Sequence, residues 1–404
     1  MRVKTASVRV AVATLLALLV APACGRGTTG ASDAAADADI DAPTDATEAG
    51  DLGTDLGDGL DADAPRIEHN GVAVQEQDGD LTLTGDLLVV RYHLAEGRLD
   101  ILGTEGRVVV QGAFARAVLA GPGAATATFD TTSQDLVSWQ AEPCSEPLGE
   151  GVAVTLVRQS KAAGNPGLVV RLWVLHRAAY LLADLSVDLP DGDPRRVQSL
   201  SPMVVEGSRA GGLFIGHDPL QHFVVDNGTD KYFDFTARVF AVGNGDSLLF
   251  GPGSASNWNA AIHDPESGRA VVAGFLTFNK GLGLVLLDFS AKDALVDDGR
   301  QGFTRFEGRI GYDPPRPPDP GGDGTSHLAS ERFYLDVNPQ TAQEGLEQYA
   351  ARVAANAGKK LWTDVPSGWN SWGGGSGSHG LGQDIDEPTI LANLEAMAQD
   401  FPHY

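Results

Sequence analysis

Two tryptophans near the C-terminal end of the sequence have a spacing and neighbours that suit them to bind a ligand. Trp369 and Trp372 enclose Asn370 and Ser371, although only six tryptophans occur among the 404 residues. The flat apolar face of an indole can stack on the C–H side of a sugar ring, and its N–H can donate to a hydroxyl. Tryptophans also fill hydrophobic cores, so residue chemistry alone leaves both roles open.

The surrounding sequence predicts a strand, a loop and a helix, in that order. Leu361 to Trp372 is a short segment before the glycine-rich residues 373–382, and Asp386 can cap a helix that tolerates Pro388 in its first turn. Side chains at the C-terminal end of a barrel strand point into the mouth of the barrel, which is where the tryptophans would then lie. Helical spacing continues through the apolar residues Ile390, Leu391, Leu394, Met397, Ala398 and Phe401.

This segment resembles the start of the catalytic barrel of the α-galactosidases (melibiases), which form glycoside hydrolase families 27 and 36 with their clan. The resemblance rests on Gly368-Trp-Asn-Ser-Trp372, followed by a loop, by Asp384-Ile-Asp-Glu387 and by a helix. It covers residues 361–404 only. The glycine-rich loop departs from the bulkier loop usual in the family, whereas a large β-sandwich ahead of the barrel agrees with family 36.

The resemblance implies retaining hydrolysis of terminal α-galactosyl residues in oligo- or polysaccharides, without a cofactor. Trp372 would be the platform beside the galactose ring, and Trp369 would shape and support the strand end. A retaining mechanism needs two carboxylates about 5 Å apart. In the family these aspartates belong to later strands. These aspartates would therefore lie beyond Tyr404. We expect the chain to be an N-terminal fragment that lacks them and is inactive alone.

The other candidate site residues in the sequence are better explained by structural roles. Asp384 and Asp386 lie at a helix start and fit capping better than catalysis. His217 and His222 are five positions apart with no further ligands beside them, so no metal site is expected. Trp258 could reach a binding surface, but core packing is its expected role.

Residues from about 68 to 336 predict one large antiparallel β-sandwich, because short alternating or β-branched runs recur without helical periodicity. Turn sequences such as Asp78-Gly-Asp80 separate them. The proline- and glycine-rich residues 313–326 are expected to form a loop between two strands. The expected strands are 81–84, 87–94, 107–111, 152–159, 168–176, 180–187, 233–242, 270–277, 283–289 and 331–337.

A helix is expected over Thr341 to Lys359, because its apolar residues, among them Leu346, Tyr349 and Val353, share one face. The predicted organisation is a signal peptide (1–23), a disordered acidic tether (24–65), a β-sandwich (66–340), a linking helix (341–360) and the start of a (β/α)8 barrel (361–404).

The N-terminal 23 residues have the basic start, apolar run and small-residue site of a secretory signal peptide. Cys24 follows, as at a bacterial lipoprotein junction where the cysteine is acylated; ordinary cleavage leaving a free cysteine is the alternative. Residues 26–65 contain eleven acidic residues against Arg26, which predicts an extended tether and supplies −10 of the formal net charge of −25. A chain this acidic is a poor candidate for binding nucleic acid.

The leading hypothesis is an exported, lipid-anchored α-galactosidase-like hydrolase at the outer cell surface or in the periplasm, with α-galactosides as its partners. A surface carbohydrate-binding lipoprotein without catalysis is the alternative. Glycosyl transfer is a third possibility, since raffinose synthase-like relatives share the start of the barrel.

Overall fold

The computed structural model describes most of the chain between residues 66 and 358. The described residues are 66–216, 218–227, 238–242, 253–288, 294–295, 301–303, 305–322, 324–358 and the single positions 388, 391 and 395. Contacts divide the chain into two units, Met1–Asp58 and Gly59–Tyr404, and every described residue belongs to the second. No helix in this described part has the length and apolar character needed to cross a membrane.

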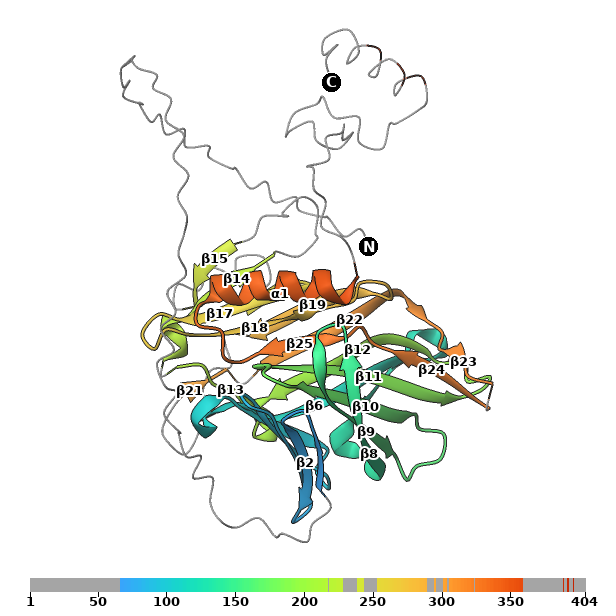
Figure 1. The fold of residues 1–404 in the computed structure, drawn as a ribbon. Coiled ribbons are helices and arrows are strands. Elements are labelled where there is room, and N and C mark those ends of the chain that lie inside the picture. The colour runs from blue at the N-terminus through green and yellow to red at the C-terminus, as the bar shows by residue number, and fades with distance from the viewer. Residues whose placement is uncertain are drawn as a thin grey trace, which may run out of the picture. The chain divides into compact units, whose positions relative to one another are not determined.

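The first sheet has twelve antiparallel strands in the order β1-β2-β3-β4-β5-β6-β12-β22-β19-β16, with β7 and β13 also paired to β6 (Figure 1). Asp78 and Gly79 both have positive φ, of 53° and 86°, which allows the tight turn between β2 and β3. The strand bounds are β1 Arg66–His69, β2 Val72–Gln77, β3 Asp80–Thr84, β4 Val89–His93, β5 Arg98–Leu102, β6 Val108–Ala120, β7 Thr126–Asp130, β12 Arg196–Glu206, β13 Gly212–Leu213, β16 Gly253–Asn257, β19 Leu282–Asp288 and β22 Arg305–Arg316.

The second sheet has eleven antiparallel strands in the order β15-β14-β17-β18-β25-β11-β10-β9-β8, with β24 paired to β11 and β23 paired to β24. A separate pair is formed by β20 Ala294–Leu295 and β21 Gln301–Gly302. The bounds are β8 Asp135–Glu146, β9 Gly149–Gln159, β10 Gly167–Leu175, β11 Tyr180–Pro190, β14 Phe223–Asp226, β15 Arg238–Ala241, β17 Asn259–Asp264, β18 Arg269–Phe275, β23 Asp319–Pro320, β24 Thr325–Ala329 and β25 Phe333–Asp336.

The main hydrophobic core lies between the inner faces of the two sheets. Alternate residues supply it, such as Leu81 and Leu83 from the first sheet and Leu181 and Leu185 from the second, all at most 1% exposed. The prediction of a large antiparallel β-sandwich is therefore confirmed. The predicted barrel segment, residues 361–404, lies outside the described residues apart from three single positions.

The outer face of the second sheet is also apolar, and helix α1 (Ala342–Asn356) covers part of it (Figure 1). Thr341 caps the helix by accepting a hydrogen bond from the backbone N–H of Glu344, at 3.1 Å. Tyr349 packs into a second cluster with Leu182 and Tyr334, and its hydroxyl donates to the carbonyl of Phe275 at 2.5 Å. The short 3-10 helices are η1 Thr104–Gly106, η2 Pro122–Ala124, η3 Thr131–Ser133, η4 Gly207–Arg209 and η5 Pro219–Gln221.

The expectation that residues 313–326 form a loop is wrong for most of the segment. Strand β22 continues to Arg316, and β23 and the start of β24 lie in the same stretch. The pairing of β22 with β12 skips at this point, since Ser199 faces Gly311 whereas Val197 faces Arg316. The intervening residues form a bulge, where proline costs no ladder hydrogen bond.

A buried arginine connects the two sheets at one end of the core. Arg158 on β9 is 0% exposed, and its guanidinium donates to the carbonyls of Leu94 at 2.8 Å and Thr131 at 3.0 Å, and also to that of Gln134. Leu94 follows a strand of the first sheet, and Thr131 begins η3. Backbone carbonyls thus replace the water that a buried charge would otherwise need.

Replacing this arginine should destabilise the fold strongly. Arg158→Met keeps an apolar stem but leaves the three carbonyls without their donor, and hydrogen bonds to charged groups contribute about 1.5–3 kcal/mol each. We expect the free energy of unfolding, measured with denaturant, to fall by about 3–5 kcal/mol.

The matched control is Arg91→Met, because Arg91 on β4 is exposed. This variant should stay within about 0.5 kcal/mol of the unmodified protein. Equal destabilisation by both substitutions would contradict the role assigned to Arg158.

Candidate functional site

The residues predicted from sequence to touch substrate or lipid lie outside the described residues. This applies to Trp369, Trp372 and Cys24, whose roles stay predictions. His217 is likewise outside, whereas His222 and Trp258 are described.

Trp258 packs against the hydrophobic core, as expected. Its ring meets that of Phe278 edge-on, with 4.7 Å between the ring centroids, and it contacts the core cluster between the sheets. Its backbone N–H donates to the carbonyl of Gly283 at 2.9 Å. A Cβ at Gly283 would approach the indole to 2.5 Å, so glycine leaves the room that this ring occupies.

His222 is buried beside a carboxylate. It is 1% exposed, neither ring nitrogen has a hydrogen-bond partner, and Nε2 lies 3.9 Å from Oδ1 of Asp264. Burial lowers the pKa of His222 to about 4, although Asp264 and Asp218 act in the opposite direction. Asp264 is held by its own turn, accepting from the backbone N–H of Glu266 at 3.1 Å and from the hydroxyl of Ser267 at 2.5 Å. Within the described residues, no group of three or more His, Cys, Asp or Glu could hold a metal ion.

A cavity lies on the outer face of the first sheet, and we name it the β12–β22 cleft. Its volume is about 910 Å³, within the range of roughly 300–1,000 Å³ usual for small-molecule sites. The floor consists of outward-facing residues from the neighbouring strands β6, β12, β22 and β19, whose alternate residues supply the core. The lining includes Arg116, Val118, Arg196, Gln198, Ser199, Lys280, Leu282, Leu284, Glu307, Arg309, Asp313, Pro314, Pro315, Arg316 and Pro317.

On one side of the cleft the charges neutralise each other. Arg116 donates to Asp130 at 2.7 Å and to Glu206 at 2.6 Å, and Arg309 donates to Glu307 at 2.8 Å. Burial is the largest single influence on Glu307 and raises its pKa, but the hydrogen bonds from Arg309 and Ser201 and the charges of Arg309 and Arg116 together outweigh it and lower the pKa. These pairs form a rigid, largely neutral part of the floor.

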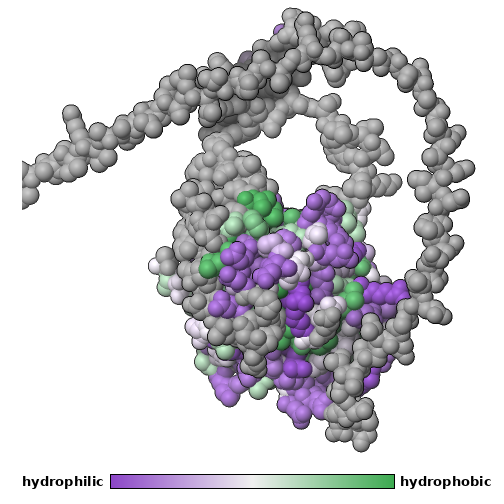
Figure 2. All heavy atoms as spheres, turned by 90° about the vertical axis from the view of Figure 1, so that its left-hand side faces the viewer, coloured by the Kyte–Doolittle hydropathy of each residue, from purple (hydrophilic) through white to green (hydrophobic). Residues whose placement is uncertain are grey.

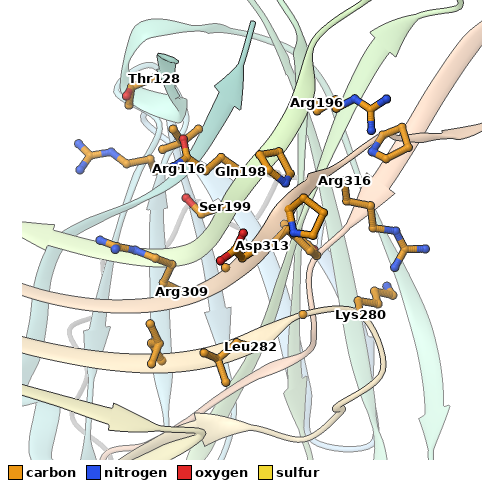
Figure 3. A pocket seen from close by; sticks show the side chains of 18 of the residues that line it. Arg116, Thr128, Arg196, Gln198, Ser199, Lys280, Leu282, Arg309, Asp313 and Arg316 are labelled. Atoms are coloured by element: carbon orange, nitrogen blue, oxygen red, sulfur yellow. The ribbon is translucent and has the colours of Figure 1, made fainter. Parts of the chain in front are cut away.

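On the other side, three cations have weaker or no ion pairs. Figure 3 shows Arg196, Lys280 and Arg316 together there, with Gln198, Ser199 and Asp313 toward the middle of the cleft. Arg196 is exposed and makes no ion pair with any described residue. Arg316 lies 3.6 Å from Asp319, and the ammonium of Lys280 donates to a backbone carbonyl, that of Ser330, at 3.2 Å.

Glu331 fixes the loop that carries Lys280 to the cleft. Its carboxylate is 1% exposed and accepts from the backbone N–H of Asn279 at 2.6 Å, from that of Lys280 and from the hydroxyl of Thr277. A buried carboxylate with these donors holds the loop without water. The position of Lys280 in the loop between β18 and β19 therefore depends on Glu331, in the segment just before β25.

A second hollow, of about 570 Å³, lies between α1 and strands β14, β15 and β17 and is lined mainly by apolar side chains, including Phe223, Val239 and Leu346. Figure 2 views the molecule from the left of Figure 1, the side on which β14 and β15 lie. There hydrophilic residues predominate, and one group of hydrophobic residues lies near the top of the coloured surface. Val239 is 69% exposed and Phe223 39% exposed.

Sequence reasoning did not find the cleft. Its charged residues come from segments that are far apart in the chain, and each one looks like an ordinary exposed strand residue. One usable signal was the cluster Asp313-Pro-Pro-Arg-Pro317, which was expected to be a plain loop.

No family model matches the chain, and no curated protein matches its sequence.

Among solved structures, the chain is similar to several glycoside hydrolases. One is the α-N-acetylgalactosaminidase NagBb from Bifidobacterium bifidum in complex with GalNAc, at 12% identity and a TM-score of 0.39, with 67% of this chain covered. Another is a glycoside hydrolase family 97 enzyme from Pseudoalteromonas sp. strain K8 in complex with acarbose, at 6% identity and a TM-score of 0.40, with 65% covered. A third is the family 36 α-galactosidase AgaB from Geobacillus stearothermophilus, at 9% identity and a TM-score of 0.38, with 68% covered.

The chain spans only 38%, 36% and 42% of the lengths of these three proteins, in the same order. Identities below 25% and TM-scores below 0.5 assign neither a family nor an activity to this chain.

Protonation of His222 should make the fold sensitive to acid. The unfolded chain binds this proton near pH 6.5, the folded protein only near pH 4. The contribution to stability is therefore complete above pH 6.5 and is lost progressively as the pH falls from 6.5 to 4. The loss is about 3 kcal/mol.

We expect His222→Leu to remove this part of the acid sensitivity when free energies of unfolding are compared at about pH 7 and pH 4.5. His69→Leu is the control, because His69 is only half-buried in β1. An identical pH dependence in the unmodified protein and His222→Leu would show that His222 is not shielded from protonation.

Proposed function

We propose that this chain belongs to an exported α-galactosidase-type glycoside hydrolase that removes terminal α-galactosyl residues with retention of configuration. The proposal is carried by the position of the stretch Gly368–Trp372. It follows a two-sheet sandwich and the helix on its outer face, and Gly368 stands twelve positions after Asn356, the last residue of α1.

The sandwich would act as a scaffold in this proposal. Tyr349 joins α1 to β18 by its hydrogen bond to the carbonyl of Phe275, and Leu346 and Val353 pack against the same apolar cluster. The chain therefore leaves the sandwich from a helix whose position is fixed by packing. A catalytic domain that follows such a helix would have a fixed starting point.

Trp372 would present its indole face to the galactose ring, and Trp369 would support the strand end. In a retaining reaction, one carboxylate attacks the anomeric carbon while a carboxylic acid protonates the departing glycosidic oxygen. Water then releases the sugar, and the first carboxylate is regenerated. The proposal assigns neither carboxyl group to a residue of this chain.

Hydrolysis of p-nitrophenyl α-galactoside by the protein encoded by the complete gene tests the proposal. We expect Trp372→Ala to lower kcat/KM about tenfold or more, because the ring loses its stacking surface. Trp139→Phe is the control, since the indole of Trp139 donates to Glu76 on the sandwich at 2.9 Å and should not affect hydrolysis.

Two results would contradict the hydrolase proposal. One is a coding sequence that continues past Tyr404 and lacks, within about fifty residues, the Asp-Asp pair that reads the sugar hydroxyls in the α-galactosidase family. The other is saturable galactoside binding without hydrolysis, which the carbohydrate-binding alternative predicts. Transfer of galactose to an added acceptor sugar in place of water would support the glycosyl transfer alternative.

Export and anchoring are a further part of the proposal, with Cys24 as the acylated residue. Metabolic labelling with palmitate should mark the unmodified protein and Cys144→Ser but not Cys24→Ser, because acylation needs the terminal thiol. The two cysteines of the chain thus supply both the test and its control. Equal labelling of both variants would exclude Cys24 as the attachment site.

A further inference from the structure

The β12–β22 cleft gathers positive charge that the protein neutralises only in part. Arg196 makes no ion pair with a described residue, Arg316 approaches Asp319 only to 3.6 Å, and Lys280 is held by a backbone carbonyl. The chain as a whole has a formal net charge of −25, so one cation unpaired within the described part and two weakly paired cations in one hollow are not a property of the composition. A cleft that concentrates one sign of charge attracts a ligand group of the opposite sign.

The three cations are held in place by different elements. Arg316 lies opposite Val197 in the pairing of β22 with β12, which places it beside the strand that carries Arg196. Lys280 comes from the loop that Glu331 fixes through backbone hydrogen bonds. Because two of these residues belong to paired strands and the third to a loop fixed by a buried carboxylate, the backbone positions of the cations are set before any ligand binds.

The rest of the lining suits a hydroxylated ligand better than a simple anion. Gln198 and Asp313 are exposed beside Ser199 and offer donors and acceptors of both kinds. The carboxylate of Asp313 would repel a small dianion but accepts hydrogen bonds from hydroxyls. Apolar surface from Pro314, Pro317 and other lining residues can cover the C–H side of a ring.

We propose that the β12–β22 cleft binds an acidic oligosaccharide. The carboxylate of a uronic acid unit lies against Arg196, Lys280 and Arg316, and the hydroxyls of the ring bond to Gln198, Ser199 and Asp313. This site is independent of the proposed hydrolysis of α-galactosides, because it rests only on described residues of the sandwich.

Calorimetric titration of the full chain with trigalacturonate tests this site. We expect saturable binding that weakens with added salt. Arg196→Gln should weaken it about tenfold or more, and Arg196→Gln combined with Lys280→Gln should abolish it. Both side chains are exposed, so the substitutions should leave the fold intact. Gln198→Ala should weaken binding a few-fold through the loss of contacts to ring hydroxyls.

Three controls make the result specific. Arg91→Gln removes an exposed charge on β4 and should bind trigalacturonate as the unmodified protein does. The methyl ester of trigalacturonate lacks the negative charge and should bind at least about tenfold more weakly. Inorganic phosphate should compete poorly, because it has no ring to contact Gln198 or the prolines.

Equal loss of affinity in Arg91→Gln, equal affinity for the methyl ester, or no saturable binding of trigalacturonate would overturn the proposal. Phosphate that displaces trigalacturonate at equal concentration, with Gln198→Ala unchanged, would show a simple anion site and would also overturn it.

Discussion

Burial of one apolar face by each of two large antiparallel sheets is the constraint on which the rest of this structure depends. Side chains alternate along a strand, so residues that fill the core, such as Phe306 and Ile310 on β22, leave Glu307 and Arg309 on the opposite face. The floor of the β12–β22 cleft is thus set by the same register that builds the core. A slip of one residue would exchange the two faces.

The two sheets use their outer faces differently. That of the second sheet is apolar around Leu182 and Tyr334, and α1 covers part of it with Tyr349. The outer face of the first sheet is polar where β6, β12, β22 and β19 meet, and it remains accessible as the cleft. Helix α1 therefore stabilises the sandwich, because it removes from water an apolar surface that the two sheets alone would expose. The cleft can remain open to a ligand because its floor is charged and does not need to be shielded from water by a helix.

The β-sandwich class could be predicted because the clearest strands alternate apolar and polar residues or are rich in β-branched residues. Leu168–Leu175 on β10 is an example. Several strands were not predicted, among them β2, β5, β8, β12, β14, β16, β17 and β22. β8 carries mostly half-buried and exposed residues, and Pro202 and two register shifts interrupt the regular pattern of β12. In β22 the prolines at 314 and 315 suggested a loop, although they lie in a bulge where no ladder hydrogen bond is needed. The strand propensity of a short segment does not reveal the neighbouring strand with which it pairs, and that pairing is what makes these segments strands.

The sequence by itself determined the class of fold, through repeated short apolar runs, and the family resemblance, through Gly368–Trp372. Those features are local, because a run of alternating residues or a pentapeptide is complete within a few positions. The tertiary structure alone decided that Arg116, Arg196, Lys280 and Arg316 share one cleft, and that, within the described part, Arg116 alone among these four is closely paired with two carboxylates. Their spacing along the chain carries no such information, since strand order in the sheet, not order in the sequence, makes β6, β12, β22 and β19 neighbours.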